Sequence, residues 1–208
     1  MTYHPPCVLS FGWEFFLRAS LEQSMAIQLW ICEGMERATE TITEIHAFDT
    51  DLCVEHTLCG RMSESETATD GENDLEWKAC VLQSFSGDFR GVAVLSMDPG
   101  EALAWVVADG SKRDIVGSFL EIGSKLLEGV VDAAQSVMDA KLAMGPSRFR
   151  EDSITGCLIS THAPPDTVAV NSTIQIRACG RNFSAQLHVL MEPKSMSRLL
   201  QALSVSMH

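Results

Sequence analysis

Hydrophobic and polar positions follow a helical rhythm over one long stretch of this chain. Between Asp114 and Ala143, apolar or small residues recur at steps of three and four, the period of a helix with one buried stripe. The buried stripe comprises Ile115, Phe119, Ile122, Leu126, Leu127, Val130, Ala134, Val137, Met138 and Leu142. The opposite face carries Glu121, Ser124, Lys125, Glu128, Asp132, Gln135 and Asp139. We predict one long helix that Gly145-Pro146 stops, with a polar edge that could meet a partner.

Three further segments have helical signals. Residues 10–40 supply apolar bulk without an interrupting proline, which predicts a first helix. Asp98-Pro99 places an acid at a cap position and proline at a first turn, which predicts a short helix up to Asp109-Gly110. Glu192-Pro193 opens a final helix with leucines on one face.

The other segments favour β-structure. Turn residues separate two pairs of apolar runs, which predicts two hairpins. The hairpins join Lys78–Phe85 to Arg90–Met97 and Val168–Cys179 to Asn182–Met191, and single strands are predicted at Thr43–Phe48, Leu52–Cys59 and Ser153–Ser160. The fold class is therefore α+β: an antiparallel sheet from a duplicated strand-hairpin-helix unit, covered on one face by long helices. We predict a single domain over 1–208.

The composition of the chain limits the partners and the cellular location that we expect for this domain. Hydrophobic residues make up 46% of 208 residues, enough for a packed core, and no apolar run approaches the roughly 20 residues that span a bilayer. The net charge of −13 argues against nucleic acid and anionic membranes as partners. The first 16 residues do not resemble a secretory signal, so we expect a cytoplasmic protein. Six acidic residues against one base, Arg61, predict a solvated, flexible loop at about 60–76.

The spacing of the cysteine and histidine residues does not predict a metal site. The seven cysteines include no Cys-x-x-Cys pair, which favours reduced core residues. Cys53, His56 and Cys59 are three apart, and such a spacing does not share one face of a strand. The acidic loop does not follow the order of an EF-hand loop. We expect no metal or cofactor of the chain's own.

Three segments, in this order, resemble the bacterial chemotaxis CheC/CheX phosphatase family, whose relatives include flagellar switch proteins. The first runs from Phe85-Ser86-Gly87-Asp88 to Met97 and the Asp98-Pro99 helix start. The second is Leu120-Glu121-Ile122-Gly123-Ser124 in the long helix, and the third is Gly180-Arg181-Asn182-Phe183 followed by Glu192-Pro193. Together they cover about residues 78–204.

The resemblance implies a particular chemistry. Members of this family dephosphorylate CheY-type response regulators with an acid, two residues, then asparagine on an exposed helix. The regulator carries the metal ion beside its aspartyl phosphate, so hydrolysis needs only a water held for in-line attack. An amide can hold that water, and the acid can fix the docking register.

This chain keeps the acid as Glu121 and has Ser124 in place of the asparagine. The residue four before the acid, usually Asp or Ser in the family, is Gly117. Asp132 and Gln135, three apart on the same helix, form an alternative pair in which Gln135 supplies the amide. Glu22 precedes Met25 at the signature spacing in the first helix, which favours a one-motif, CheX-like layout.

Two functions follow from the resemblance. The first is a phosphatase acting on a CheY-type response regulator, with Glu121 docking and Ser124 or Gln135 orienting water. The alternative is a catalytically inactive binding module that docks on a response regulator or flagellar switch component. A homodimer whose exposed helix edge contacts only water is a third, structural reading.

Overall fold

The computed structural model describes residues 21–46, 50–61, 76–108, 114–164 and 166–206. Seven strands within these ranges form one sheet. The strands are β1 (Thr50–Arg61), β2 (Lys78–Gly87), β3 (Gly91–Met97), β4 (Leu142–Met144), β5 (Arg148–Asp152), β6 (Val168–Ala178) and β7 (Arg181–Met191). Their order is β1-β6-β7-β3-β2-β4, β5 also pairs with β2, and every pairing is antiparallel. The predicted antiparallel sheet is confirmed.

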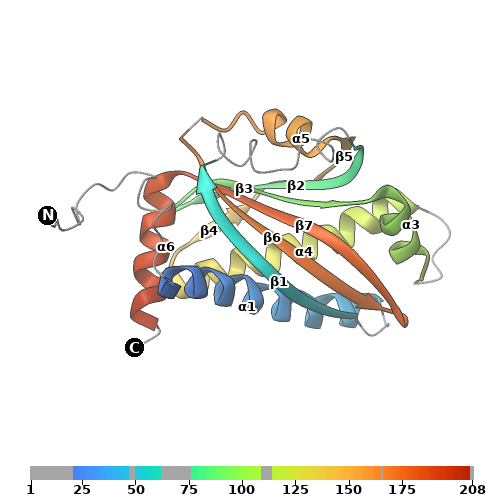
Figure 1. Ribbon diagram of the computed structural model, residues 1–208, viewed down its shortest axis with the longest axis horizontal. Coiled ribbons are helices and arrows are strands. Elements are labelled where there is room, and N and C mark those ends of the chain that lie inside the picture. Colours follow the sequence, from blue (N-terminus) through green and yellow to red (C-terminus); the bar gives the residue numbers. More distant parts are fainter. Residues whose placement is uncertain (1–20, 47–49, 62–75, 109–113, 165, 207–208) are drawn as a thin grey trace, which may run out of the picture.

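Helices cover the sheet unequally. The described helices are α1 (Leu21–His46), α3 (Pro99–Ala108), α4 (Ile115–Met138), α5 (Ile154–Ser160) and α6 (Pro193–Ser206). The long helices α1 and α4 lie with α6 on one face, and the short α5 lies on the other (Figure 1). The hairpins β2–β3 and β6–β7 meet through β3 and β7, and each is followed by a helix, as the duplicated unit predicts. The described helices include none that is long and apolar enough to cross a membrane.

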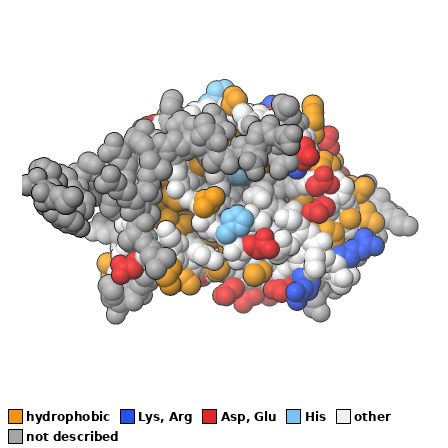
Figure 2. All heavy atoms as spheres, in the orientation of Figure 1, with side chains coloured by type: hydrophobic (Ala, Val, Ile, Leu, Met, Phe, Trp, Pro, Cys, Tyr) orange, Lys and Arg blue, Asp and Glu red, His pale blue; other side chains and the backbone are white. Residues whose placement is uncertain are grey.

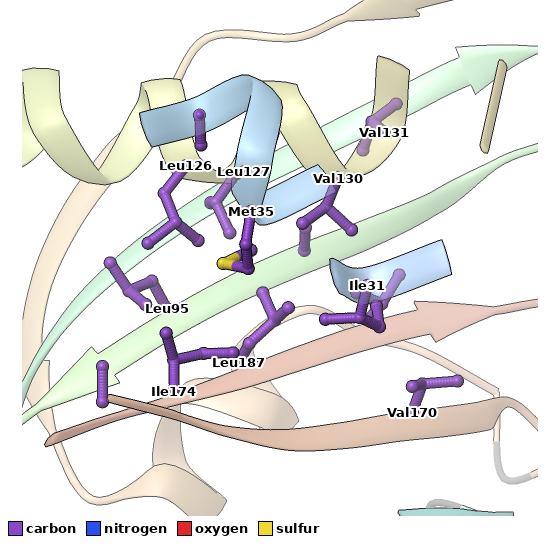
Figure 3. Close-up of a cluster of buried hydrophobic side chains, with 14 of the residues drawn as sticks. Ile31, Met35, Leu95, Leu126, Leu127, Val130, Val131, Val170, Ile174 and Leu187 are labelled. Carbon is purple, nitrogen blue, oxygen red and sulfur yellow. The ribbon is translucent and has the colours of Figure 1, made fainter. Parts of the chain in front are cut away.

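The main core lies between the sheet and the long helices. Ile31 and Met35 of α1 meet Leu126 and Leu127 of α4 above the strand residue Leu187, and all are almost fully buried (Figure 3). Burial of such side chains contributes about 1.5–3 kcal/mol each. This packing fixes which faces of α1 and α4 remain in solvent.

Helices α1 and α4 approach each other closely. A methyl group built on Gly129 would lie 2.5 Å from the carbonyl oxygen of Gly34, so both positions need glycine for the contact. The Trp30 indole donates a hydrogen bond of 3.0 Å to the Val130 carbonyl in the same interface. The exposed edges of the two helices therefore form one continuous surface.

The long helix is shorter than the predicted 114–143 stretch. It ends at Met138, because Asp139 adopts a left-handed conformation with φ 46° and its N–H turns back to the carbonyls of Gln135 and Ser136. Leu142–Met144 then pair with β2 as β4, so the prediction that Gly145-Pro146 ends the helix was wrong.

Two predicted strands are helical. Thr43 to His46 are the last turn of α1, and Phe48 lies outside the described residues. Ser153–Ser160 was predicted as a strand, but the Ser153 hydroxyl accepts a 3.0 Å hydrogen bond from Gly156 N–H and starts α5. A short apolar run fits a helix and a strand equally well, and a serine cap at its start can make it helical.

The remaining predicted elements have clear outcomes. The two hairpins, the strand at Leu52–Cys59 and the helices after Asp98 and Glu192 are confirmed. Residues 10–20, Asp109-Gly110 and most of the acidic segment, residues 62–75, lie outside the described residues.

Candidate functional site

The polar edge of α4 is held in solvent by the packing of its opposite face. The helix begins at Asp114, whose side chain accepts a 2.8 Å hydrogen bond from Gly117 N–H. Glu121 and Asp132 are exposed along this edge. Lys125 and Glu128 lie between them and form an ion pair of 2.7 Å. The edge is thus a charged stripe.

Arg37 of α1 joins this stripe to the neighbouring helix. Its guanidinium pairs with Glu33 at 2.6 Å and donates a 2.9 Å hydrogen bond to the Ser136 hydroxyl of α4. Partial burial raises the pKa of the Asp132 carboxyl, Glu128 adds to the rise, and Arg37 and Lys125 oppose it. The two helices therefore share one electrostatic surface.

We name this surface the acidic helical face. Its acids are Glu33, Glu36, Glu40 and Glu44 of α1 and Glu121, Glu128 and Asp132 of α4, and its bases are Arg37 and Lys125. Acidic side chains are visible along the margin of the molecule where α1 runs (Figure 2). With seven acids and two bases, the face is strongly negative and suits a basic partner surface.

The structure places the first predicted catalytic pair in two environments. Glu121 is exposed, whereas Ser124 is only 8% exposed. The Ser124 hydroxyl donates a 2.6 Å hydrogen bond to the Leu120 carbonyl one turn earlier. Serine in a helix interior commonly makes this bond. The Ser124 hydroxyl therefore does not project beside the Glu121 carboxylate.

The alternative pair is also divided. Asp132 lies exposed on the acidic helical face, but Gln135 is half-buried. The Gln135 amide oxygen accepts a 3.0 Å hydrogen bond from Leu142 N–H, which ties the end of α4 to β4. This amide oxygen has a structural partner within the chain.

Sequence reasoning missed the role of Arg37. The only sequence signal was the spacing of Glu33 and Arg37, four apart in a predicted helix. The Arg37 guanidinium can contact Ser136 because Gly34 and Gly129 let the two helices approach closely. The hydrophobic period of either helix does not predict this approach.

The described residues contain no group of three His, Cys, Asp or Glu side chains that could hold a metal ion. A β-bulge between Val54 and His56 shifts the strand register. His56 Nε2 lies 3.1 Å from the Thr173 hydroxyl, Cys53 is exposed, and Cys59 packs against the core, where burial raises its pKa to about 12. These three side chains do not converge.

Comparison with known proteins bears on the fold. No protein-family model and no curated protein matches this sequence. FliY from Thermotoga maritima is similar in structure, with a TM-score of 0.68 and 11% identity over 90% of this chain and 98% of that chain. At this identity the likeness shows that the two chains share a fold.

Two further structures share the fold of this chain. A chain of the FliG–FliM complex from H. pylori has a TM-score of 0.60 and 11% identity, covering 88% of this chain and 100% of that chain. CheX from Desulfovibrio desulfuricans has a TM-score of 0.50 and 10% identity, covering 79% of this chain and 99% of that chain. At these identities the likeness concerns the fold.

Proposed function

We propose that this chain is a binding module of flagellar and chemotaxis signalling that docks through its acidic helical face and carries out no hydrolysis. The observation that carries the proposal is the state of Ser124, whose buried hydroxyl is bonded to Leu120 while the neighbouring acid, Glu121, stays exposed. The face keeps an exposed acid, whereas the Ser124 hydroxyl and the Gln135 amide oxygen already have hydrogen-bond partners within the chain.

The chemistry explains why this arrangement favours binding. Hydrolysis of an aspartyl phosphate needs a water aligned for in-line attack, and displacement of about 1 Å can cost a hundredfold in rate. Ser124 would have to leave its 2.6 Å bond to Leu120 and emerge from the packed face to hold that water. Gln135 would have to release Leu142 N–H. Both movements cost hydrogen bonds that the folded chain already makes.

The partner is inferred from fold and charge together. One structural neighbour, FliM, is a component of a FliG–FliM complex, so a FliG-type protein of the flagellar switch is the first partner to test. A CheY-type response regulator is the second. A net negative helical face implies a basic patch on either partner and binding that weakens with salt. We expect this docking to occur in the cytoplasm.

The phosphatase remains a second proposal because Glu121, the acid of the signature, is retained and exposed. In that case Glu121 and Ser124, or Asp132 and Gln135, would position water on the regulator's aspartyl phosphate, and the regulator would supply the metal ion.

Charge reversal tests the docking surface. Purified FliG-type and beryllofluoride-activated CheY-type proteins from the same organism are titrated with wild type and with the double variant Glu121→Lys/Glu128→Lys in a calorimeter. We expect the double variant to bind its partner at least about tenfold more weakly at low salt. Glu55→Lys is the matched control, because Glu55 is exposed on β1, outside the acidic helical face. Equal loss in the control, or no binding by wild type to either protein, would contradict the proposal.

A further inference from the structure

Two buried cysteines on the second face of the sheet carry the further inference. Cys80 belongs to β2 and Cys157 to α5, the short helix that lies on the face opposite α1 and α4 (Figure 1). The packing of α5 places both cysteines in one small buried cluster, together with Val94, Leu158 and Leu190. Each of the two cysteines is 0% exposed. Residues far apart in the sequence thus meet in an apolar environment.

The two thiols interact directly. A hydrogen bond between the Cys80 and Cys157 side chains is the largest influence on the pKa of each thiol. Both cysteines are free thiols. A disulfide requires two sulfur atoms to approach to about 2.05 Å, so a pair that is already hydrogen-bonded needs only a small movement of α5 toward β2.

The surroundings of the pair favour Cys157 as the reactive thiol. The hydrogen bond from Cys80 lowers the pKa of Cys157, the Arg150 guanidinium adds to the decrease, and burial and the Asp152 carboxylate oppose it. The same hydrogen bond and burial raise the pKa of Cys80, which therefore keeps its proton. The thiolate is the nucleophile in thiol oxidation, so Cys157 reacts first and Cys80 second.

Helix α5 gives a small oxidant access to the pair. It has seven residues, of which Cys157 and Leu158 are buried. A helix with so few buried side chains opens locally at a lower free energy than the main core does. Hydrogen peroxide is close to water in size, so a brief opening of α5 exposes the thiols to it.

We propose that Cys80 and Cys157 form a reversible oxidation site, at which hydrogen peroxide converts the two thiols into a disulfide that links β2 to α5. The Cys157 thiolate attacks one peroxide oxygen and the O–O bond breaks. The departing hydroxide takes up the proton that Cys157 released, which leaves a sulfenic acid and one water. The Cys80 sulfur then attacks the sulfenic sulfur, the S–O bond breaks, and the second hydroxide leaves with the Cys80 proton as water. The two sulfurs together lose two electrons, and the peroxide gains them.

The proposed site is separate from the acidic helical face. Helix α5 lies on the other side of the sheet from α1 and α4, so the inference does not depend on the proposed docking (Figure 1). In a reducing compartment such a disulfide is transient and reports the presence of oxidant. Its direct effect is to fasten α5 to the sheet.

Mass spectrometry of the full chain tests this site. The reduced protein is treated with hydrogen peroxide at neutral pH, the remaining thiols are alkylated, and the chain is digested without reductant. We expect a peptide pair joined through Cys80 and Cys157 that dithiothreitol separates. The same treatment in concentrated urea should lower the yield of this pair at least about tenfold, because unfolding removes the contact between the thiols.

Oxidation should also stabilise the chain. The new bond closes a long loop, so the melting temperature of wild type should rise by at least about 4 °C. Cys157→Ala should abolish both the joined peptide pair and this rise. The matched control is Cys53→Ala, at an exposed cysteine of β1, which should keep both. The comparison with urea uses wild type alone and so does not depend on the folding of either variant.

Several results would overturn the inference. They are the absence of the joined pair after peroxide treatment, an equal yield of the pair in the folded chain and in urea, or Cys80 and Cys157 joined chiefly to other cysteines. Oxidation of Cys157 to a sulfinic acid while Cys80 stays reduced would contradict the second step. A melting temperature that rises equally in oxidised Cys157→Ala would place the stabilising bond elsewhere.

Discussion

His188 makes the stability of this fold depend on pH. The residue lies on β7 and is 7% exposed. Its Nδ1 is 2.9 Å from the Asn171 amide oxygen, and its Nε2 is buried without a partner among the described residues. Burial lowers the pKa of His188 from 6.5 to about 4, because the charged imidazolium would lose its hydration.

The direction of the effect follows from the two pKa values. Between pH 6.5 and about 4 the unfolded chain binds a proton at this histidine and the folded chain does not. The contribution of His188 to the free energy of unfolding is therefore fully present above pH 6.5 and decreases as the pH is lowered through this window. The whole shift corresponds to about 3 kcal/mol, of which about 2 kcal/mol is lost between pH 7.5 and pH 5.

Urea unfolding of wild type and His188→Gln at pH 7.5 and pH 5 measures this contribution. Acids elsewhere titrate equally in both proteins, so the difference between their pH-dependent losses isolates His188. We expect wild type to lose about 2 kcal/mol more than His188→Gln over this interval. Identical losses in wild type and His188→Gln would refute the reasoning.

Two further substitutions test the packing and a helix start by urea unfolding. Gly129→Ala should lower the free energy of unfolding by about 1–3 kcal/mol despite the better helix propensity of alanine, because the new methyl group would meet the Gly34 carbonyl oxygen at 2.5 Å. Gly100→Ala on α3, where the nearest atom is an Asp98 carboxylate oxygen at 3.1 Å, is the control, and a gain in Gly129→Ala would show that the helices do not touch there. Ser153→Ala should cost about 1 kcal/mol by removing the cap of α5, and an unchanged unfolding midpoint would argue against that cap.

The sequence predicted correctly those elements that are set by turn and cap residues close by in the chain. Gly180-Arg181 between two alternating runs specified the β6–β7 hairpin, and Asp98-Pro99 specified the start of α3. The Asp98 side chain accepts hydrogen bonds from the N–H groups of Gly100 and Glu101, as its cap position predicts. These elements depend on contacts between residues close in sequence.

The errors arose where distant contacts decide the structure. Leu142 continues the apolar period of the long helix, but pairing with Gly87 of β2 makes it a strand residue. The left-handed Asp139 ends the helix earlier, and aspartate tolerates that conformation better than most residues. Neither the partner strand nor the turn is visible in the helical period.

The candidate site was predictable only in part. The polar period correctly placed Glu121 and Asp132 in solvent, because their opposite faces are apolar. It could not show that Ser124, at the margin of the packed face, would bond to Leu120 and be buried. A small polar residue at such a margin can donate a hydrogen bond to a carbonyl of its own helix and so be buried. The hydrophobic period of the sequence alone therefore does not decide its exposure.

The release of inorganic phosphate from a phosphorylated CheY-type regulator of the same organism tests the central claim most directly. The account predicts that saturating amounts of this chain leave the regulator's own rate of phosphate loss unchanged, because Ser124 and Gln135 are engaged within the fold. Acceleration of release by wild type, abolished in Glu121→Ala and Ser124→Ala, would contradict the account and establish the phosphatase instead.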